Sequence, residues 1–146
     1  MKERKRVTRK GFTMIELMAV LIILGLLFTL VATRVADQID KARVTTTKAN
    51  LKTLHMAINQ FKMDTSRFPT EDEGLDALIE QPSDVINYPQ GGYLETTEVT
   101  KDGWGNEFYY EVVPESGKPF VIISWGADGE EGGEDYDADL YSTDAF

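Results

Sequence analysis

The chain begins with a short polar segment, continues into a long apolar run, and then changes to a mixed pattern that lasts to its end. Between residues 12 and 33 the only charged residue is Glu16. A helix needs roughly 17 or more apolar residues to cross a bilayer. The pattern therefore predicts a membrane-spanning or assembly helix over residues 12–33.

The apolar run passes without a helix breaker into a segment of helical periodicity, and the first proline is Pro69. Two helices joined near Arg34 are one interpretation. We favour a single helix from about Thr13 to Met63, roughly 75 Å long at about 1.5 Å per residue. A domain of this size cannot bury such a helix, so its first half needs lipid or neighbouring copies. In the later segment the predicted buried stripe consists of Val35, Ile39, Ala42, Thr46, Ala49, Leu54, Ile58 and Phe61.

Shorter elements are predicted after the long helix. Thr70 and Glu73 have the spacing of a capping box, which predicts a short helix that Pro82 ends. Strand-forming residues occupy 107–113 and 120–124, with a turn-rich segment between them, and so predict an antiparallel hairpin. One hairpin is marginal alone, so it must pack on the polar half of the long helix. The fold class is therefore α+β.

The charge pattern of the chain changes where the apolar run begins. Six basic residues and one acidic residue lie in the first ten positions, whereas the whole chain has a formal net charge of −10. A basic segment before a spanning helix places the N-terminus in the cytoplasm and the body outside. The acidic body lacks the basic surface that nucleic-acid binding needs. We predict a basic leader over 1–11, the apolar helix over 12–33 and a globular domain over 34–146.

Glu16 is the unusual residue of the apolar segment. A carboxylate in hydrocarbon costs on the order of 2.5 kcal/mol or more and needs a partner, yet no Lys, Arg or His precedes Arg34 in the run. If the chain were cut after Gly11, Phe12 would carry a new α-amino group. In a staggered array that amine could meet Glu16 of a neighbouring copy, so both charges would be satisfied.

Two other interpretations of the N-terminus stay open at this point. The first is an ordinary secretory signal peptide, whose apolar core of about 7–15 residues is shorter than the run seen here. The second is a simple single-pass anchor, with Glu16 as a surface residue before the span. That interpretation explains the apolar run but gives no role to the Gly11–Phe12 junction.

The residues Gly11-Phe12-Thr13 with Glu16, followed by an apolar run, resemble the type IV pilin and pseudopilin signature. The resemblance implies that a prepilin peptidase cuts after Gly11 and N-methylates Phe12, and that Glu16 acts in assembly. Nearly the whole chain resembles one branch, the major pseudopilins of the type II secretion system. Gly103 is a departure, because that branch usually has proline there. The segments that carry this resemblance are 41–43, 49–52, 67–70, 73–75, 102–106 and 126–129.

This resemblance implies a structural subunit of a periplasmic pseudopilus that drives folded exoproteins across the outer membrane. It implies a single-pass inner-membrane protein with a periplasmic C-terminal domain. The implied partners are further copies of the chain, prepilin peptidase, minor pseudopilins, an inner-membrane assembly platform and, before assembly, membrane lipid. No catalytic constellation accompanies the single histidine, His55, so we do not expect an enzyme. The alternatives are a type IV or competence pilin and, outside the class, a membrane-anchored calcium-binding module.

Residues 125–139 are dense in carboxylates and glycines, and the chain has no cysteine. Ca²⁺ binds about 6–8 oxygens from carboxylates and backbone carbonyls on a flexible chain. A solvated acidic tail is the alternative, since most charge runs behave in that way. The resemblance favours a calcium-clamped loop where many type IV pilins have a disulfide. We predict Asp128 and Asp139 as side-chain ligands, Asp137 as the third candidate, and the backbone carbonyl of Trp125.

Overall fold

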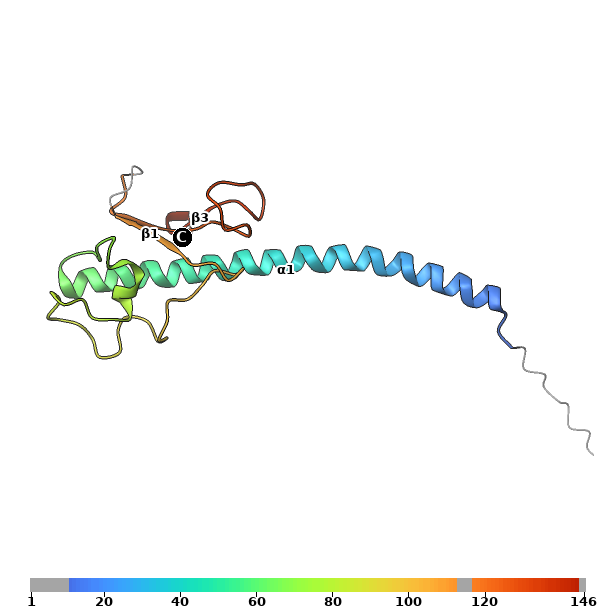
Figure 1. Ribbon diagram of the computed structural model, residues 1–146, viewed down its shortest axis with the longest axis horizontal. Helices are drawn as coiled ribbons and strands as arrows, with labels where there is room; N and C mark the ends of the chain where they lie inside the picture. Colours follow the sequence, from blue (N-terminus) through green and yellow to red (C-terminus); the bar gives the residue numbers. More distant parts are fainter. Residues whose placement is uncertain (1–10, 113–116, 145–146) are drawn as a thin grey trace, which may run out of the picture. The chain divides into compact units, whose positions relative to one another are not determined.

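The computed structural model describes residues 11–112 and 117–144 (Figure 1). The leader predicted over 1–11 therefore lies outside the described residues except for Gly11, and so does Val113 at the end of the predicted first strand. The chain divides into two compact units. The first ends at Gln38 and the second begins at Ile39.

The first element is α1, a single α-helix that covers Met14–Thr65. It confirms the predicted continuous helix and shows no break at Arg34. The helix ends where Ser66 adopts a left-handed conformation with a φ of 63°. A serine in this region is unusual, and its N–H still donates to the carbonyl of Lys62 at 2.8 Å. This bond satisfies one of the free carbonyls of the last helical turn.

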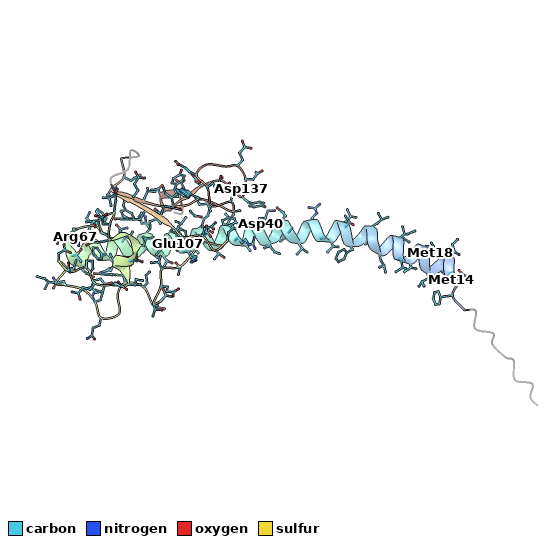
Figure 2. The ribbon with its side chains drawn as sticks, in the orientation of Figure 1. Met14, Met18, Asp40, Arg67, Glu107 and Asp137 are labelled. Carbon is cyan, nitrogen blue, oxygen red and sulfur yellow. The ribbon has the colours of Figure 1, made fainter. Side chains whose placement is uncertain are left out.

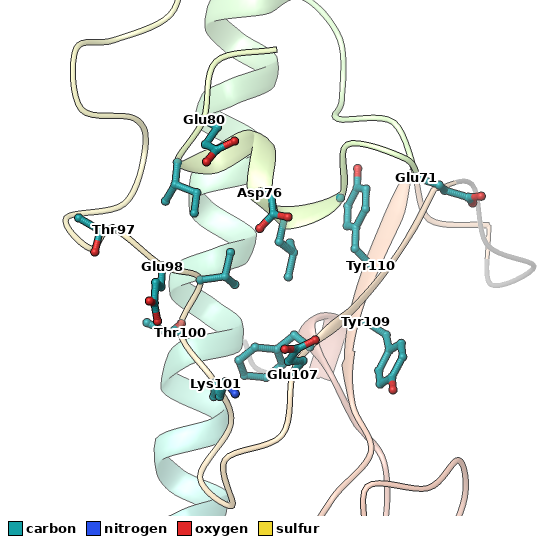
Figure 3. Close-up of a pocket in the computed structure, with 15 residues that line it drawn as sticks. Glu71, Asp76, Glu80, Thr97, Glu98, Thr100, Lys101, Glu107, Tyr109 and Tyr110 are labelled. Atoms are coloured by element: carbon teal, nitrogen blue, oxygen red, sulfur yellow. The ribbon is translucent and has the colours of Figure 1, made fainter.

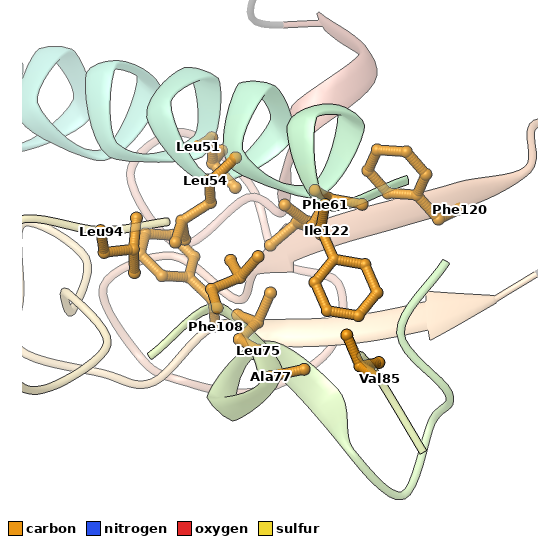
Figure 4. Packing of buried hydrophobic residues seen from close by; sticks show 13 residues of the cluster. Leu51, Leu54, Phe61, Leu75, Ala77, Val85, Leu94, Phe108, Phe120 and Ile122 are labelled. Carbon is orange, nitrogen blue, oxygen red and sulfur yellow. The ribbon is translucent and has the colours of Figure 1, made fainter. Parts of the chain in front are cut away.

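The hydrophobic core lies in the second unit, where the C-terminal part of α1 meets the sheet and a short helical turn (Figure 4). Helix α1 contributes four fully buried apolar side chains, Leu51, Leu54, Ile58 and Phe61. Their spacing of three and four residues places them on one side of the helix. The opposing side chains of the core include Leu75, Leu78, Leu94, Phe108, Phe120 and Ile122.

Only the last part of the predicted buried stripe is correct. Leu54, Ile58 and Phe61 are buried, but Ile39 is exposed, as are Ala42, Thr46 and Ala49. Thr47 and Leu51 occupy the buried face instead. The expected stripe was wrong there because its small residues form a weak apolar face. Gly103 instead contacts Arg43 and Thr47, and these contacts set the side of the helix that is buried.

The predicted short helix is present as a 3-10 turn, η1 (Gly74–Leu78). The two capping-box bonds form as expected, because Thr70 N–H donates to Glu73 Oε2 at 2.8 Å and Glu73 N–H donates to Thr70 Oγ1 at 3.3 Å. Gly74 has a φ of 55°. This left-handed residue interrupts right-handed helical geometry between the capping-box turn and η1. The element is therefore short, and it ends at Leu78, before Pro82.

The predicted hairpin is confirmed by β1 (Tyr109–Val112) and β2 (Phe120–Ser124), which pair antiparallel with Tyr110 opposite Ile122. The strand β2 is central in a three-stranded sheet of order β1-β2-β3. Four of its five residues are buried. The continuous apolar run of β2 therefore reflects contact on both faces.

The third strand, β3 (Leu140–Tyr141), was not predicted. It pairs antiparallel with β2, with Tyr141 opposite Ile123, and it leads into a 3-10 turn, η2 (Ser142–Asp144). Two residues are too few to give an alternating pattern. The strand brings the end of the described chain back onto the sheet after the acidic loop.

Arg67 joins the end of α1 to the residues around η1. Its two terminal nitrogens donate to the two carboxylate oxygens of Glu73, each at 2.7 Å, and Nη2 also donates to Asp84 at 2.7 Å. The hydrogen bonds from Arg67 lower the pKa of Glu73 to about 2, and the same contacts raise the pKa of Arg67. A bidentate pair of this kind fixes orientation as well as charge.

Candidate functional site

The predicted cleavage junction lies in exposed, non-helical chain before α1. Gly11 and Phe12 are both exposed, and the Phe12 side chain is 86% exposed. A Cβ added at Gly11 would meet nothing within 4 Å. The fold itself therefore does not require glycine at this position.

Glu16 lies in the first turn of α1 and is exposed. Its carboxylate accepts the N–H of Thr13 at 3.5 Å, and its own N–H donates to Thr13 Oγ1 at 3.2 Å. These reciprocal bonds form a capping box, which explains why the helix begins here. Sequence reasoning used Thr13 only as part of a motif and missed this capping role.

The helix surface that follows Glu16 is apolar and uncovered by the chain. Every side chain from Leu17 to Val31 is exposed, and Figure 2 shows them projecting from the helix beyond Met18. Among the described residues, α1 is long and apolar enough to cross a membrane. An apolar surface of this extent needs lipid or another protein to cover it.

The acidic loop is closed by its own backbone. The carbonyl of Trp125 accepts the N–H of Gly129 at 3.1 Å. The N–H of Ala127 donates to the carbonyl of Tyr136 at 2.9 Å. Gly126 has a φ of 60° and packs so closely that a Cβ would overlap the backbone carbonyl of Asp137. This close approach explains the glycine at 126 without reference to a metal.

The three predicted calcium ligands are held differently. Asp139 accepts the N–H of Gly132 at 3.1 Å and the hydroxyl of Tyr141 at 3.2 Å. Asp128 accepts the N–H of Glu130 at 3.1 Å, and the Asp137 side chain is exposed. The residue types suit a hard cation. Within the described chain, however, no three His, Cys, Asp or Glu side chains are grouped to hold a metal, so binding would require side-chain movement.

Asp102 is a buried carboxylate whose role sequence reasoning missed. Its Oδ1 accepts the N–H groups of Trp104 at 2.9 Å and Asn106 at 2.8 Å, and its Oδ2 accepts the hydroxyl of Ser124 at 2.8 Å. Aspartate commonly caps the turn that follows it, and that was the available signal. The third bond, across 22 positions to β2, has no local signal.

Gly103 connects the turn between Asp102 and Asn106 to α1. Its N–H donates to Thr47 Oγ1 at 2.9 Å, and Asn50 donates to the carbonyl of Lys101 at 2.8 Å beside it. A Cβ at Gly103 would overlap the carbonyl of Arg43. The residue that departs from the expected proline is therefore explained, because proline has no N–H to give to Thr47.

His55 and Ser142 are in contact, and a catalytic pair can consist of the same two residue types, but their surroundings do not suit catalysis. His55 Nδ1 lies 3.3 Å from Ser142 Oγ, and its ring lies 4.7 Å from that of Phe120. Burial lowers the pKa of His55. Ser142 is fully buried, and its hydroxyl also accepts the N–H of Ile122 at 3.0 Å. The pair therefore holds η2 onto α1 and β2, where a substrate has no access to the serine.

Comparison with known proteins separates the same two parts of the chain. Residues 34–143 match the model for "Type II secretion system (T2SS), protein G", and residues 6–32 match the "Prokaryotic N-terminal methylation motif". The chain is 39% identical to type II secretion system core protein G of Pseudomonas aeruginosa over 96% of this chain and 99% of that protein. It is 36% identical to the Vibrio cholerae protein of the same name, over 96% and 94% of the two chains.

The fold is also similar to a solved structure, the major pseudopilin from the type 2 secretion system of enterohaemorrhagic Escherichia coli. The TM-score is 0.59 at 28% sequence identity, with 70% of this chain and 87% of that chain covered. A long N-terminal helix on a small antiparallel sheet is therefore shared, and the methylation motif lies where the Gly11–Phe12 junction was predicted. By these matches, the chain belongs to the type II secretion system protein G family of major pseudopilins.

Proposed function

We propose that this chain is a structural subunit that polymerises into the type II secretion pseudopilus and so drives folded exoproteins across the outer membrane. Prepilin peptidase cuts it after Gly11 and N-methylates Phe12. The observation that supports this role most directly is Glu16, a carboxylate at the start of an apolar helix surface that the described chain leaves exposed. The role requires no catalytic residue in this chain.

The proposed assembly contact joins two copies. The α-amino group created at Phe12 by cleavage meets the Glu16 carboxylate of a neighbour inside a bundle of apolar helices. Isolated in such a bundle, either charge would be strongly destabilising. Pairing removes that penalty and fixes the axial stagger between copies, because only one register brings the two groups together.

The proposed topology follows from the basic leader and the apolar helix. The N-terminus lies in the cytoplasm, residues 12–33 cross the inner membrane, and residues 34–146 lie in the periplasm. Before assembly, lipid covers the exposed side chains between Leu17 and Val31. Minor pseudopilins and the inner-membrane assembly platform are the further partners of the assembled form.

Processing is the first property to test. The full chain is produced with and without a prepilin peptidase, and its intact mass and N-terminal sequence are determined. We expect a product that starts at methylated Phe12 only when the peptidase is present. A chain left uncut, or cut near Ala32 to Ala36, would overturn the proposal and leave a plain anchor or a secretory signal.

We also propose that the acidic loop binds Ca²⁺ through Asp128, Asp139, Asp137 and the carbonyl of Trp125. Seven acidic residues and no basic residue occupy 125–139, so a divalent cation would relieve their mutual repulsion. The loop lies between β2 and β3. A bound ion would therefore stabilise the pairing that returns the chain to the sheet.

Calorimetric titration of the full chain in detergent with Ca²⁺, and with Mg²⁺ as comparison, tests this proposal. We expect heat of binding and a raised Tm with Ca²⁺, and loss of both in Asp139→Asn. The matched control is Glu131→Gln, which removes one charge from the same loop at an exposed position. Absence of Ca²⁺ binding by the unaltered chain, or equal loss in both variants, would contradict the ligand set.

A further inference from the structure

The outer side of α1 in the second unit carries a row of positive charge. Lys41, Lys48 and Lys52 are exposed and separated by seven and four residues. At about 100° per residue they fall within about 40° of one another, and about 120° round the helix from the buried line through Thr47. We call these three lysines the basic ridge. It is unusual here, because only nine basic residues against 24 acidic residues follow Gly11.

A groove of about 650 Å³ lies elsewhere in the same unit, between η1, the segment 97–101 and the start of β1 (Figure 3). We call it the acidic groove, because Figure 3 shows carboxylates around it and Lys101 is the one basic residue among the described residues that line it. Its apolar floor includes Leu75 and Phe108, both buried. The carboxylates are Glu71, Asp76, Glu80, Glu98 and Glu107.

We propose that, in the polymer, the basic ridge of one copy docks in the acidic groove of the next. The two surfaces are complementary in charge, and they are different patches of one chain. A contact between different patches is heterologous, and its repetition builds a ring or, where the rotation does not close, an open helical filament such as the proposed pseudopilus. This inference rests on the proposed function and adds to it a second, electrostatic contact, separate from that of Glu16.

The composition of the groove suits lysine side chains in particular. A lysine lays its four-carbon stem along apolar surface and keeps the ammonium in a polar setting. Ile79 and Val99 are partly buried and pack on the core at the groove, so they supply the apolar surface. The surrounding carboxylates supply the counter-charge. Complementary charges of this kind set the register between partners and disfavour wrong pairings.

Charge reversal tests the contact in the full chain, produced with prepilin peptidase and the secretion machinery. Lys48→Glu places like charges together, so we expect filament yield to fall by about tenfold or more. The groove variant Glu98→Lys/Glu107→Lys should fail alone to a similar extent. Co-production of both variants should restore filaments. In alternating copies the reversed charge at position 48 faces the reversed charges at positions 98 and 107, and the unaltered ridge faces the unaltered groove. The matched control is Lys118→Glu, an exposed lysine outside the ridge.

Crosslinking gives an independent measurement. The chain contains no cysteine, so Lys48→Cys in one copy and Glu98→Cys in a differently tagged copy provide the sole reactive pair. A short bismaleimide should join the two tags in assembled filaments but not in detergent-solubilised monomers. Wild-type filaments without this crosslink, or with full yield from Lys48→Glu, would overturn the ridge and groove contact alone. Failure of the wild-type chain to assemble would instead overturn the proposed function.

Discussion

Residues of the same type have opposite surroundings in the two units of the chain. Leu24 in the first unit is 55% exposed, whereas Leu54 in the second is 0% exposed. Gly25 has open space around it, whereas Gly103 is pressed against the α1 backbone. One continuous helix thus serves two environments, of which the chain itself supplies only the second.

This contrast shows that apolar content alone does not identify a core. The second unit is complete within one chain, with a cluster around Leu54 and a turn bonded to Thr47. The apolar side chains of the first unit are exposed in the single chain and become buried only against lipid or other copies. Substitutions of the same type in the two regions should therefore affect different measurements, namely assembly for the first and unfolding free energy for the second.

The largest effect on filament assembly is expected at Glu16. Glu16→Gln keeps the size of the side chain but removes its charge, which would leave the Phe12 amine of a neighbour without a counter-ion in an apolar bundle. A loss of about 2.5 kcal/mol per contact corresponds to a drop of roughly 50-fold or more. Sedimentation of filaments from cells measures this yield, with exposed Glu95→Gln as the control. Wild-type yield from Glu16→Gln would contradict the pairing.

The next prediction compares the stability effects of substitutions at Leu54 and Leu24. Leu54→Ala should lower the unfolding free energy by about 2–5 kcal/mol, because it leaves a cavity in a closely packed core. Leu24→Ala should change it by less than about 0.5 kcal/mol. Urea unfolding of the full chain in detergent, followed by tryptophan fluorescence, reports on the second unit because both tryptophans, Trp104 and Trp125, lie there. Equal losses in the two variants would show that the regions are not independent.

Much of the fold was predictable because its signals are local. The helix over Met14–Thr65, the hairpin and the capping box between Thr70 and Glu73 each follow from patterns within a few residues of one another. The N-terminal motif was predictable for the same reason, since Gly11, Phe12 and Glu16 lie within one short segment. Such local interactions are kept in the folded chain, because tertiary contacts form in addition to them and do not replace them.

The remaining features depend on contacts between distant parts of the chain. The two-residue strand β3 exists only because β2 offers it a partner. The buried bond from Ser124 to Asp102 joins residues 22 positions apart, and Gly103 is explained only by its contacts with Arg43 and Thr47 on α1. The calcium ligands remain a prediction, because loop composition gives donor chemistry without fixing which side chains converge.

A smaller loss of unfolding free energy is expected at Gly103, and Gly25 serves as its comparison. Gly103→Ala would push a methyl group against the Arg43 carbonyl and weaken the bond to Thr47, so it should cost about 1–3 kcal/mol, as overpacking does. Gly25→Ala meets nothing within 4 Å and should not destabilise the second unit. The same urea titration measures both. Unchanged stability in Gly103→Ala would show that the turn can move away from α1.

The smallest effect concerns Glu73, whose cationic partner Arg67 lies in the same chain. Hydrogen bonds from Arg67 lower the pKa of Glu73 to about 2 from 4.5. Its contribution is therefore complete above the unfolded pKa and is lost as pH falls from about 5 towards 2. Solvent screening limits that contribution to about 2 kcal/mol. Unfolding free energies at pH 7 and pH 3 should differ less in Glu73→Gln than in the unaltered chain, with exposed Asp72→Asn as the control. An unchanged difference would place the acid sensitivity in carboxylates other than Glu73.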